Sequence, residues 1–439
     1  MNNGYKVGLY TLGCKVSLYE TEAIAERFAE VGYTVVPFDT PADVYVINTC
    51  TVTAESDAKS RKYIRRAIRN NPNAVVIVIG CYSQRSPEEV ALIKGVSAVL
   101  GTQDKLSSVE IATRLLKTRA EECLVSAPSL DGAKFEDMCV RSSSRTRGYV
   151  KIEDGCDCKC SYCAISAARG PVRSKKPADV IREVEGLAAD GCLEVVLTGI
   201  ETGSYGADFE EKYNLADLLS ELDRRGSCHR IRLGSMAPEL VTRELVDRLS
   251  TLKIFVPHIH LSVQSASDSV LRGMKRRYNS RMLFEAVNYA KKKIPDILFT
   301  ADLMVGFPGE KEEDFLKTVA FVREAMLLDA HVFAYSRREG TPATDYPDQI
   351  PEPVKRERSA RLILEKNRVR DELLSGIVSG GKTLSVVAES RDGEYFVGHS
   401  EGYVEVKVPS EEDISGRLLR VKPLSHSGGT VYGEILEID

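Results

Sequence analysis

The sequence contains no long hydrophobic run. Its most apolar stretch, residues 74–79, is far shorter than the roughly 20 apolar residues that a membrane-spanning helix needs. The opening residues MNNGYKVGLYTLG also lack the basic region followed by a long apolar segment that a secretory signal would have. We therefore expect a cytoplasmic protein with no membrane partner. Its 43% hydrophobic and 28% charged residues are typical of a globular protein, and 439 residues allow about two to four domains.

The sequence also shows no obvious Ser/His/Asp triad and no evident pair of general acids. What it has instead is 11 cysteines, a number that is both high and odd. In a chain without an export signal, such cysteine usage favours metal binding or redox chemistry over disulfides. We therefore expect metal or redox chemistry that is sensitive to oxygen.

Three cysteines form a compact motif, Cys-x3-Cys-x2-Cys, within GCDCKCSYCAISAARG. They are Cys156, Cys160 and Cys163. Cysteine is the usual ligand of iron–sulfur clusters, and three ligands leave one iron of a cubane cluster open to a substrate. A structural zinc site is the alternative, but it needs four ligands, and no second Cys pair or nearby histidine follows before His229. Cys158 lies inside the motif, so local spacing alone also permits other triads. We call residues 156–163 the cysteine loop.

A second group of cysteines is spread over the first part of the chain. Residues 5–12, 44–47 and 75–79 read as buried strands separated by helices, which predicts a parallel sheet. Each strand is followed by a cysteine in a polar loop, and we call these three residues the strand-end triad: Cys14, Cys50 and Cys81. Ligands of open parallel sheets bind beyond the carboxyl ends of the strands, so the three thiols are expected to converge. The alternative is three buried structural thiols.

The remaining pattern predicts an α/β protein of three domains. Residues 120–147 lack an apolar period and contain SSSRTR, which suggests a linker and places the first domain at 1–138. Six strand candidates alternating with helices follow in a second domain, 139–371, and predict an incomplete TIM-type barrel: 148–152, 193–198, 229–234, 258–263, 299–305 and 330–335. Active sites of such barrels lie in the loops after the strands, and the cysteine loop follows the first strand. Short glycine-punctuated strands at 383–388, 395–398, 403–408 and 430–437 predict a small antiparallel β-barrel in the third domain, 372–439, or else a generic sandwich.

With both groups of cysteines in place, the chain resembles the radical S-adenosylmethionine methylthiotransferase family from end to end. The matching segments are TLGCKVSLYE, INTCTVT, GCYSQ, GCDCKCSYCAISAARG, LTGIETGSYG, RIRLGSMAPE, HIHLSVQSASDSVLRGMKRRY, DLMVGFPGE and HVFAYSRREGTPAT. The resemblance implies a flavodoxin-like N-terminal methylthiotransferase domain, a partial (β/α)6 radical S-adenosylmethionine barrel and a C-terminal TRAM domain.

The resemblance also implies the cofactors and their ligands. Two 4Fe-4S clusters and S-adenosylmethionine are expected, one cluster held by the cysteine loop and an auxiliary cluster held by the strand-end triad. Cys158 is then a bystander, and Tyr162 is expected beside the adenine. Weaker candidates for contact with S-adenosylmethionine lie at strand ends: Gly199, Glu201, Ser235, Gln264 and the turn residue Gly306. For each of these, a role only in loop hydrogen bonds or turn packing is the alternative.

The family's substrates leave a choice. TLGCKV is similar to the bacterial branch that converts N6-threonylcarbamoyladenosine at tRNA position 37 to its 2-methylthio derivative. The alternatives within the family are isopentenyladenosine in tRNA and an aspartate of a ribosomal protein, and Ser17, Ser166 and Ala334 depart from common family residues. A noncatalytic iron–sulfur electron carrier or RNA-binding protein is the alternative of another class. Three-cysteine ligation disfavours the carrier, because four cysteines would serve electron transfer better.

The expected partners are the tRNA anticodon stem-loop, a reductant such as flavodoxin or ferredoxin, and a sulfur donor. RNA binding requires cations that contact phosphate. The candidates come from two basic runs in the chain: Lys62, Arg65, Arg66, Arg276 and Arg277. A solvated charged face is the ordinary alternative. The third domain carries 6 basic and 12 acidic residues, which argues against bulk attraction of RNA. It leaves two alternatives, a protein substrate or RNA recognition through a local basic patch formed by Lys407, Arg417, Arg420 and Lys422.

Overall fold

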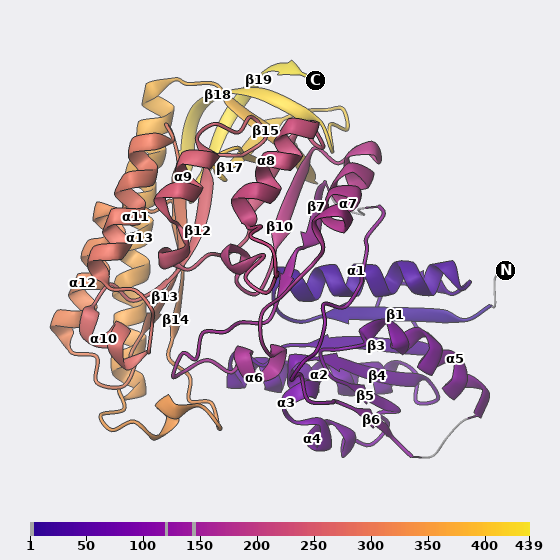
Figure 1. The fold of residues 1–439 in the computed structure, drawn as a ribbon. Coiled ribbons are helices and arrows are strands. Elements are labelled where there is room, and N and C mark those ends of the chain that lie inside the picture. Colours follow the sequence, from indigo (N-terminus) through magenta and orange to yellow (C-terminus); the bar gives the residue numbers. More distant parts are fainter. Residues whose placement is uncertain (1–3, 119–121, 143–145) are drawn as a thin grey trace. The chain divides into compact units, whose positions relative to one another are not determined.

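The computed structural model describes residues 4–118, 122–142 and 146–439 (Figure 1). It separates into two compact units, each assembled from three stretches of chain. Unit 1 comprises Met1–Val140, Glu153–Lys175 and Ser336–Thr344, and unit 2 comprises Arg141–Ile152, Lys176–Tyr335 and Asp345–Asp439. Of the expected linker 120–147, residues 120, 121 and 143–145 lie outside the described part. No helix within the described residues combines the length and apolarity needed to cross a membrane.

Unit 1 is built on a six-stranded parallel sheet. Its strands, in spatial order, are β2 (Thr34–Val36), β1 (Lys6–Thr11), β3 (Val44–Thr49), β4 (Val75–Gly80), β5 (Ala98–Leu100) and β6 (Leu124–Ser126). Every residue of β3 and β4 is buried, because helices cover both faces of a parallel sheet. The order of the first five strands is the flavodoxin-like order, which confirms the expected fold of the N-terminal part.

Two hydrophobic cores flank this sheet. On one face, α1 (Lys15–Glu30) and α5 (Ser108–Thr118) pack with residues such as Phe28 and Val109 against the strands. On the other face lie α2 (Ala54–Asn70), α3 (Cys81–Arg85) and α4 (Pro87–Ala91), packed through residues such as Ile64 and Val90. Unit 1 also contains the short 3-10 helix η1 (Lys105–Ser107), the two-stranded ribbon of β8 (Glu153–Asp154) and β9 (Arg173–Ser174), and α6 (Ile165–Arg169).

Unit 2 contains the six expected parallel strands, arranged as two triplets. One triplet has the order β11 (Arg230–Leu233), β10 (Glu194–Thr198), β7 (Arg147–Lys151), and the other has the order β12 (His258–Gln264), β13 (Leu298–Val305), β14 (Asp329–Ala334). Isolated bridges, Ile231 to Phe255 and Met236 to Leu261, connect the triplets. The helices between the strands are α7 (Pro177–Ala189), α8 (Leu215–Arg225), α9 (Arg243–Leu249), α10 (Asp268–Gly273), α11 (Ser280–Lys293) and α12 (Glu312–Glu324), with the 3-10 turns η2 (Thr202–Ser204) and η3 (Pro238–Leu240). This is the open barrel that the strand–helix alternation predicts.

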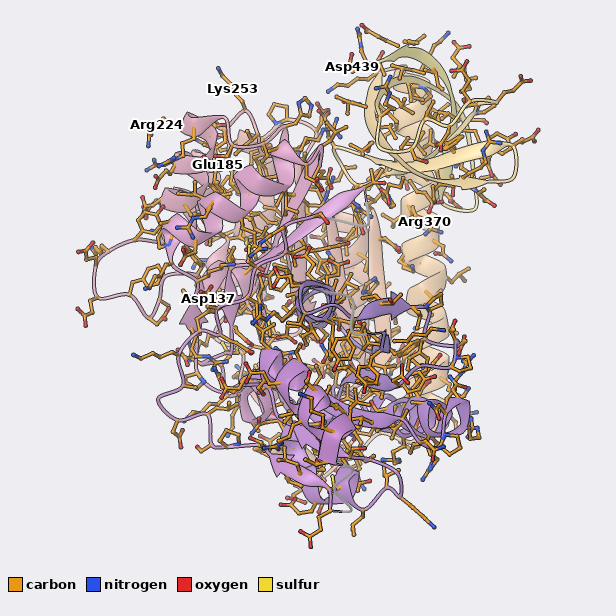
Figure 2. The ribbon with its side chains drawn as sticks, turned by 90° about the vertical axis from the view of Figure 1, so that its right-hand side faces the viewer. Asp137, Glu185, Arg224, Lys253, Arg370 and Asp439 are labelled. Carbon is orange, nitrogen blue, oxygen red and sulfur yellow. The ribbon has the colours of Figure 1, made fainter. Side chains whose placement is uncertain are left out.

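The end of unit 2 is a long helix and a closed β-barrel. The 3-10 turn η4 (Pro342–Asp345) precedes α13 (Glu352–Gly380), which lies along β14 and β18. The barrel closes in the order β15 (Leu384–Asp392), β16 (Tyr395–Ser400), β17 (Glu405–Pro409), β19 (Thr430–Ile438), β18 (Leu418–Ser427). Arg370 lies on α13 (Figure 2). Its side chain approaches the turn between the last two strands, because a Cβ on Gly429 would lie 2.5 Å from the Arg370 Cζ.

The closed barrel confirms the predicted fold of the C-terminal part, and it adds two details. Strand β18 has no counterpart in the sequence pattern, because its polar residues, Pro423 and two register shifts mask the alternation. The β17–β19 pair is parallel, whereas the other four pairs are antiparallel. An odd number of strands cannot close a barrel with strict alternation of direction, so one parallel pair is required.

Candidate functional site

The three thiols of the strand-end triad lie at one edge of the unit 1 sheet. Cys50 follows β3 directly, Cys81 follows β4 directly, and Cys14 occupies the N-cap position of α1, the helix that follows β1. Because β1, β3 and β4 are adjacent parallel strands, their carboxyl ends meet at the same edge. The backbone at Gly13 passes close to Cys50: a Cβ on Gly13 would lie 3.0 Å from the Cys50 Cβ and 3.2 Å from its Sγ. The fold thus brings Cys14 and Cys50 side by side.

Burial shapes the chemistry of the strand-end triad. Burial raises the pKa of the Cys50 thiol, and the facing Cys14 acts in the same direction. Burial also raises the pKa of Cys81 to about 12, where Arg169 opposes the shift and Cys14 and Cys50 add to it. A bound metal would oppose these shifts at Cys50 and Cys81, because its positive charge stabilises the thiolate form.

The cysteine loop is held by backbone hydrogen bonds within unit 1. The Cys156 N–H donates to the Gly170 carbonyl over 3.0 Å, and the Cys163 N–H donates to the Cys160 carbonyl over 3.2 Å. Two sulfurs accept backbone hydrogen bonds of 3.4 Å: Cys156 Sγ from the Cys158 N–H, and Cys163 Sγ from the Ile165 N–H. Such donors tune the potential of iron–sulfur clusters. Cys158 thus supplies a main-chain donor whatever its side chain does.

The donor chemistry of both cysteine groups fits an iron–sulfur cluster. In the described ranges, no three or more His, Cys, Asp or Glu side chains close around a point as they would around a single metal ion. A cubane cluster instead spreads its ligand sulfurs across its own width, and three thiols with one open iron are a sufficient set. The cysteine loop adds hydrogen bonds to its sulfurs, and the strand-end triad adds the close passage of Gly13 behind Cys50.

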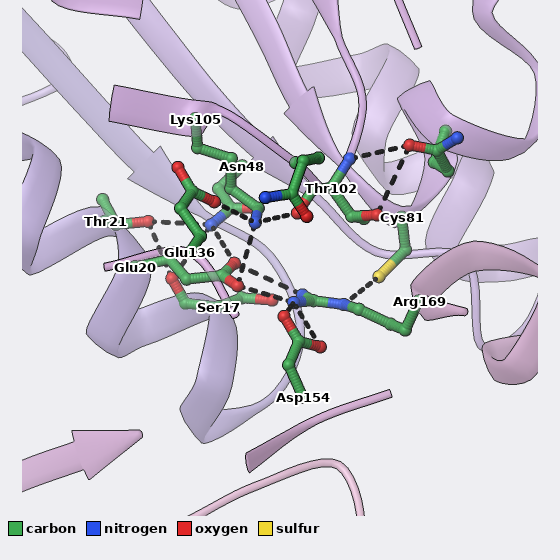
Figure 3. A network of polar contacts seen from close by, with 12 residues as sticks. Ser17, Glu20, Thr21, Asn48, Cys81, Thr102, Lys105, Glu136, Asp154 and Arg169 are labelled. Atoms are coloured by element: carbon green, nitrogen blue, oxygen red, sulfur yellow. Dashed lines mark hydrogen bonds and ion pairs between the residues drawn. The ribbon is translucent and has the colours of Figure 1, made fainter. Parts of the chain in front are cut away.

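A buried arginine that sequence reasoning missed contacts the strand-end triad. Arg169, at the end of α6, donates from Nε to Cys81 Sγ over 3.2 Å and pairs with Glu20 and Asp154 (Figure 3). Burial alone would lower the pKa of Arg169, but the facing Cys81, Glu20 and Asp154 raise it well above its ordinary value. The only signal in the sequence is its place in CSYCAISAARG, a few residues after Cys163.

The segment 336–344 of unit 1 touches three parts of the site. Arg338 Nη2 donates to Thr51 Oγ1 over 2.5 Å, next to Cys50. Arg85, on the helix that begins with Cys81, donates to the Glu339 carbonyl over 2.5 Å. The Ala343 N–H donates to the Ser161 carbonyl over 2.8 Å, inside the cysteine loop. This short segment therefore connects the cysteine loop with two strands of the triad.

The other predicted cofactor residues belong to unit 2, except Tyr162, which is half-buried in the cysteine loop of unit 1. Gly199, Glu201 and Ser235 follow β10 and β11, and Gln264 is the last residue of β12. Glu201 is buried and accepts a hydrogen bond of 2.9 Å from the Ala237 N–H, and the Ser235 carbonyl accepts one of 3.2 Å from the Thr202 N–H. These two residues therefore have loop hydrogen bonds of their own.

Gln264 differs from them, because part of its side chain lacks a partner. It has a positive φ of 62°, is only 7% exposed, and its Oε1 has no hydrogen-bond partner among the described residues. A buried acceptor without a donor is costly, so a bound ligand that donates a hydrogen bond would fit at this strand end. S-adenosylmethionine carries such donors in its amino, hydroxyl and adenine groups.

Gly306 has a clear packing reason to be glycine. Its φ is 71°, its N–H donates to Glu310 Oε2 over 2.7 Å, and a Cβ there would lie 2.4 Å from the Lys355 Cγ. The turn is therefore shaped by α13, which carries Lys355. Contact of Gly306 with adenine stays a prediction.

The predicted RNA-binding cations differ in how they are engaged. Lys62 and Arg65 are exposed on α2, whereas Arg66 pairs with Asp39 at 2.6 Å. In unit 2, Arg277 is exposed, whereas Arg276 donates to the Ser262 carbonyl over 2.9 Å and lies over the Tyr278 ring at 5.0 Å. The charges of Lys62 and Arg65 are therefore the more accessible ones in unit 1.

Comparisons with known proteins agree with this architecture. Residues 150–322 match the model of the Radical SAM superfamily, and residues 6–101 match that of Uncharacterized protein family UPF0004. The threonylcarbamoyladenosine tRNA methylthiotransferase MtaB of Bacillus subtilis (strain 168) is 41% identical over 98% of this chain and 95% of its own length. The chain belongs to the radical S-adenosylmethionine methylthiotransferase family.

Other relatives and solved structures extend this result. A methylthiotransferase of the same name from Aquifex aeolicus is 35% identical over 95% of this chain and 99% of its own length. The tRNA-2-methylthio-N(6)-dimethylallyladenosine synthase of Bacillus subtilis is 31% identical over 100% of this chain and 88% of its own. The radical S-adenosylmethionine methyltransferase TsrM from Kitasatospora setae shares the fold, with a TM-score of 0.58 and 18% identity over 78% of this chain and 77% of that one. This methylthiotransferase thus belongs to a family that uses S-adenosylmethionine and a 4Fe-4S cluster.

Proposed function

We propose that this protein is a tRNA methylthiotransferase that converts N6-threonylcarbamoyladenosine at position 37 to its 2-methylthio derivative. The observation that carries this substrate is a difference between relatives from one organism. The Bacillus subtilis protein named for threonylcarbamoyladenosine is 41% identical to this chain, whereas the one named for dimethylallyladenosine is 31% identical. The TLGCKV segment at Cys14 points to the same branch.

We further propose that the chain binds two 4Fe-4S clusters. Cys156, Cys160 and Cys163 would hold the cluster that binds S-adenosylmethionine, and Cys14, Cys50 and Cys81 would hold the auxiliary cluster. When bound, the two clusters supply reductive cleavage of S-adenosylmethionine and the sulfur that joins the methyl group to the base. The protein contributes placement, hydrogen bonds to the sulfurs and exclusion of water. Support comes from the strand-end position of the triad and from the donors at Cys156 and Cys163.

Gln264 is the best supported of the proposed cofactor contacts, because its buried Oε1 lacks a donor among the described residues. Tyr162, Gly199, Glu201, Ser235 and Gly306 remain proposals for the same role. For RNA, we propose that exposed Lys62 and Arg65 contact phosphate in the anticodon stem-loop, with Arg66, Arg276 and Arg277 in support. A small electron-transfer protein and a sulfur donor complete the reaction, which we place in the cytoplasm.

Mass spectrometry of nucleosides from total tRNA, with and without this gene, tests the substrate. We expect loss of 2-methylthio-N6-threonylcarbamoyladenosine alone, with N6-threonylcarbamoyladenosine accumulating. Loss of the isopentenyl analogue would instead assign the enzyme to the sister branch. Unchanged tRNA would favour a ribosomal protein as substrate, which the acidic C-terminal barrel would suit, since residues 372–439 hold 6 basic and 12 acidic side chains.

A further inference from the structure

Arg169 is the centre of a buried polar network in unit 1 (Figure 3). Its side chain is fully buried, and its Nε donates to Cys81 Sγ over 3.2 Å. A guanidinium cannot lose its charge in a protein, and its five donors lie in one plane. A permanent cation therefore faces one sulfur of the strand-end triad in direct contact.

Two carboxylates fix the orientation of this cation. Arg169 Nη1 lies 2.5 Å from Glu20 Oε1 and 3.3 Å from Asp154 Oδ2, and Nη2 donates to Glu20 Oε2 over 3.3 Å. The two carboxylates contact Nη1 and Nη2, which leaves Nε to donate to Cys81. Asp154 comes just before Cys156 in the chain, and Arg169 comes shortly after Cys163. The pair therefore anchors the two ends of the cysteine loop.

The same network reaches the elements that carry the other two cysteines of the triad. Glu20 lies on α1, whose first residue follows Cys14. Asn48, just before Cys50, donates to Glu20 Oε2 over 3.4 Å. Lys105 is fully buried and pairs with both Glu20 and Glu136 at 3.2 Å, and Arg173 Nη2 lies 3.5 Å from Asp154 Oδ2. Three cations therefore face three carboxylates in this network. One connected set of buried charges therefore borders all three strand ends and the cysteine loop.

We propose that Arg169 is a positioning residue for the auxiliary cluster, which holds the Cys81 sulfur in place and raises the cluster's reduction potential. This inference rests on the proposed function, because it requires a cluster on the strand-end triad. A hydrogen bond and a fixed positive charge at a ligand sulfur stabilise the reduced cluster, which carries the more negative charge. Glu20 and Asp154 orient the planar guanidinium of Arg169. A lysine at this position would keep the positive charge but could not contact Cys81, Glu20 and Asp154 together.

The test uses the full chain with Cys156→Ala, Cys160→Ala and Cys163→Ala, reconstituted without oxygen with iron and sulfide, so that only the auxiliary cluster is observed. Into this background we would introduce Arg169→Lys, and separately Arg169→Met with Asp154→Asn. The double change removes a positive and a negative charge together. Glu20 keeps Lys105 as its partner, and Arg173, which loses the Asp154 carboxylate, keeps its hydrogen bonds to the Arg169 and Pro171 carbonyls. The readouts are iron per chain and the midpoint potential followed by electron paramagnetic resonance.

Arg232→Lys is the matched control. Arg232 is 1% exposed and makes an equally buried bidentate pair with Glu194, at 2.7 and 2.9 Å. It belongs to unit 2, and its other hydrogen bonds go to the carbonyls of Ser400 and Glu401 instead of a sulfur. This variant controls for the general structural effect of losing a buried bidentate arginine–carboxylate pair. We expect it to leave the iron content and the midpoint potential of the auxiliary cluster unchanged.

We expect the midpoint potential to fall in Arg169→Lys and to fall further in the charge-balanced double variant. In the otherwise intact enzyme, we expect methylthiolation to fall about 10- to 100-fold in the double variant, the usual effect of removing a partner of a metal ligand. Arg169→Lys should recover part of that loss. If the double variant fails to fold, the midpoint potential of Arg169→Lys alone tests the proposal. An unchanged potential in that variant would overturn it.

The outcomes separate this inference from the proposed function. If the background variant with intact Arg169 binds no cluster, the auxiliary cluster itself is wrong and both proposals fall. If the cluster loads with the same potential in all variants, the cluster stands and Arg169 is only a structural ion-pair partner. If Arg169 variants lose or shift the cluster while Arg232→Lys does not, the positioning role is supported.

Discussion

Arg338 and Asp57 form an ion pair with Nη1 and Oδ2 2.8 Å apart, although 281 positions separate them in the chain. Both side chains are mostly buried, with 7% and 15% exposed. Asp57 lies in the first turn of α2, the helix that follows Cys50, and Arg338 also contacts Thr51. The pair therefore fastens the segment 336–344 to the strand end that carries one predicted ligand.

Replacing Arg338 with Met should loosen the start of α2. The change leaves Asp57 without its cation in a mostly buried place, a loss of about 3 kcal/mol by analogy with other broken buried pairs. We expect faster amide hydrogen exchange in α2 and around Cys50, with the core of β4 unaffected, because local opening costs less than global unfolding. Arg361→Met is the control, since Arg361 pairs with Glu312 and Glu357 on the surface, 41% exposed. Equal exchange changes in both variants would contradict a special role for Arg338.

Removing the two cysteine groups separately should separate two activities. With Cys156, Cys160 and Cys163 all changed to Ala, we expect no cleavage of S-adenosylmethionine to 5′-deoxyadenosine and about half of the iron. With Cys14, Cys50 and Cys81 changed to Ala, we expect cleavage to continue while no methylthio product forms. Liquid chromatography with mass detection measures both products.

Cys158→Ala is the control for these variants, because its backbone N–H, which donates to Cys156 Sγ, is kept. Both activities should persist in it. Product formation after loss of the strand-end triad would show that the auxiliary cluster has been misassigned, and unchanged cleavage after loss of the cysteine loop would refute the other assignment.

Gly13→Ala should selectively weaken the auxiliary cluster. The φ of Gly13 is 114°, and an added Cβ would meet the Cys50 Cβ at 3.0 Å and its Sγ at 3.2 Å, so Cys50 must shift. We expect loss of about one cluster's iron while cleavage of S-adenosylmethionine is retained. Gly132→Ala is the control. Gly132 also has a positive φ, 70°, but an added Cβ there would have nothing within 4 Å. It should cost about 1–2 kcal/mol of stability and no iron. Full iron in Gly13→Ala would show that the triad tolerates the shift.

Asp302→Asn should destabilise unit 2 in a pH-dependent way. Burial alone would raise the pKa of Asp302, but hydrogen bonds from His260 and His331 hold it well below its ordinary value of 3.8. The same hydrogen bond raises the pKa of His331 above its ordinary value of 6.5. The contribution of the Asp302 carboxylate to the free energy of unfolding is therefore complete above about pH 4. The contribution of protonated His331 is complete below pH 6.5 and is lost as the pH rises through its raised pKa.

Thermal unfolding of the metal-free chain between about pH 5.5 and 8.5 measures this effect. We expect Asp302→Asn to lower the midpoint by about 2 °C at the acidic end, with the difference shrinking as the pH rises. Asp296→Asn is the control, because its partner Lys382 stays charged across this range. A difference that is constant or grows with pH would contradict the assignment.

Much of the fold could be predicted from the sequence, because the pattern of apolar and polar residues that indicates strands and helices is periodic and local. Buried runs such as residues 75–79 and the helices between them were sufficient to predict a parallel sheet and an open barrel. Strand β18 escaped prediction because Pro423 and its register shifts interrupt the alternation. Gly306 illustrates the limit at a single residue: a tight turn was predicted, but its steric reason, Lys355, comes from a distant helix.

The sequence by itself determined which thiols this protein carries and which sheet edge the strand-end triad shares, because spacing and position after a buried strand can be read along the chain. Only the tertiary structure decided the surroundings of those thiols. Arg169 and Cys81 are 88 positions apart, and Arg338 and Thr51 are 287 apart. Local propensity cannot encode such pairs, since a buried cation meets its partners only when the folded chain brings them together and removes them from water.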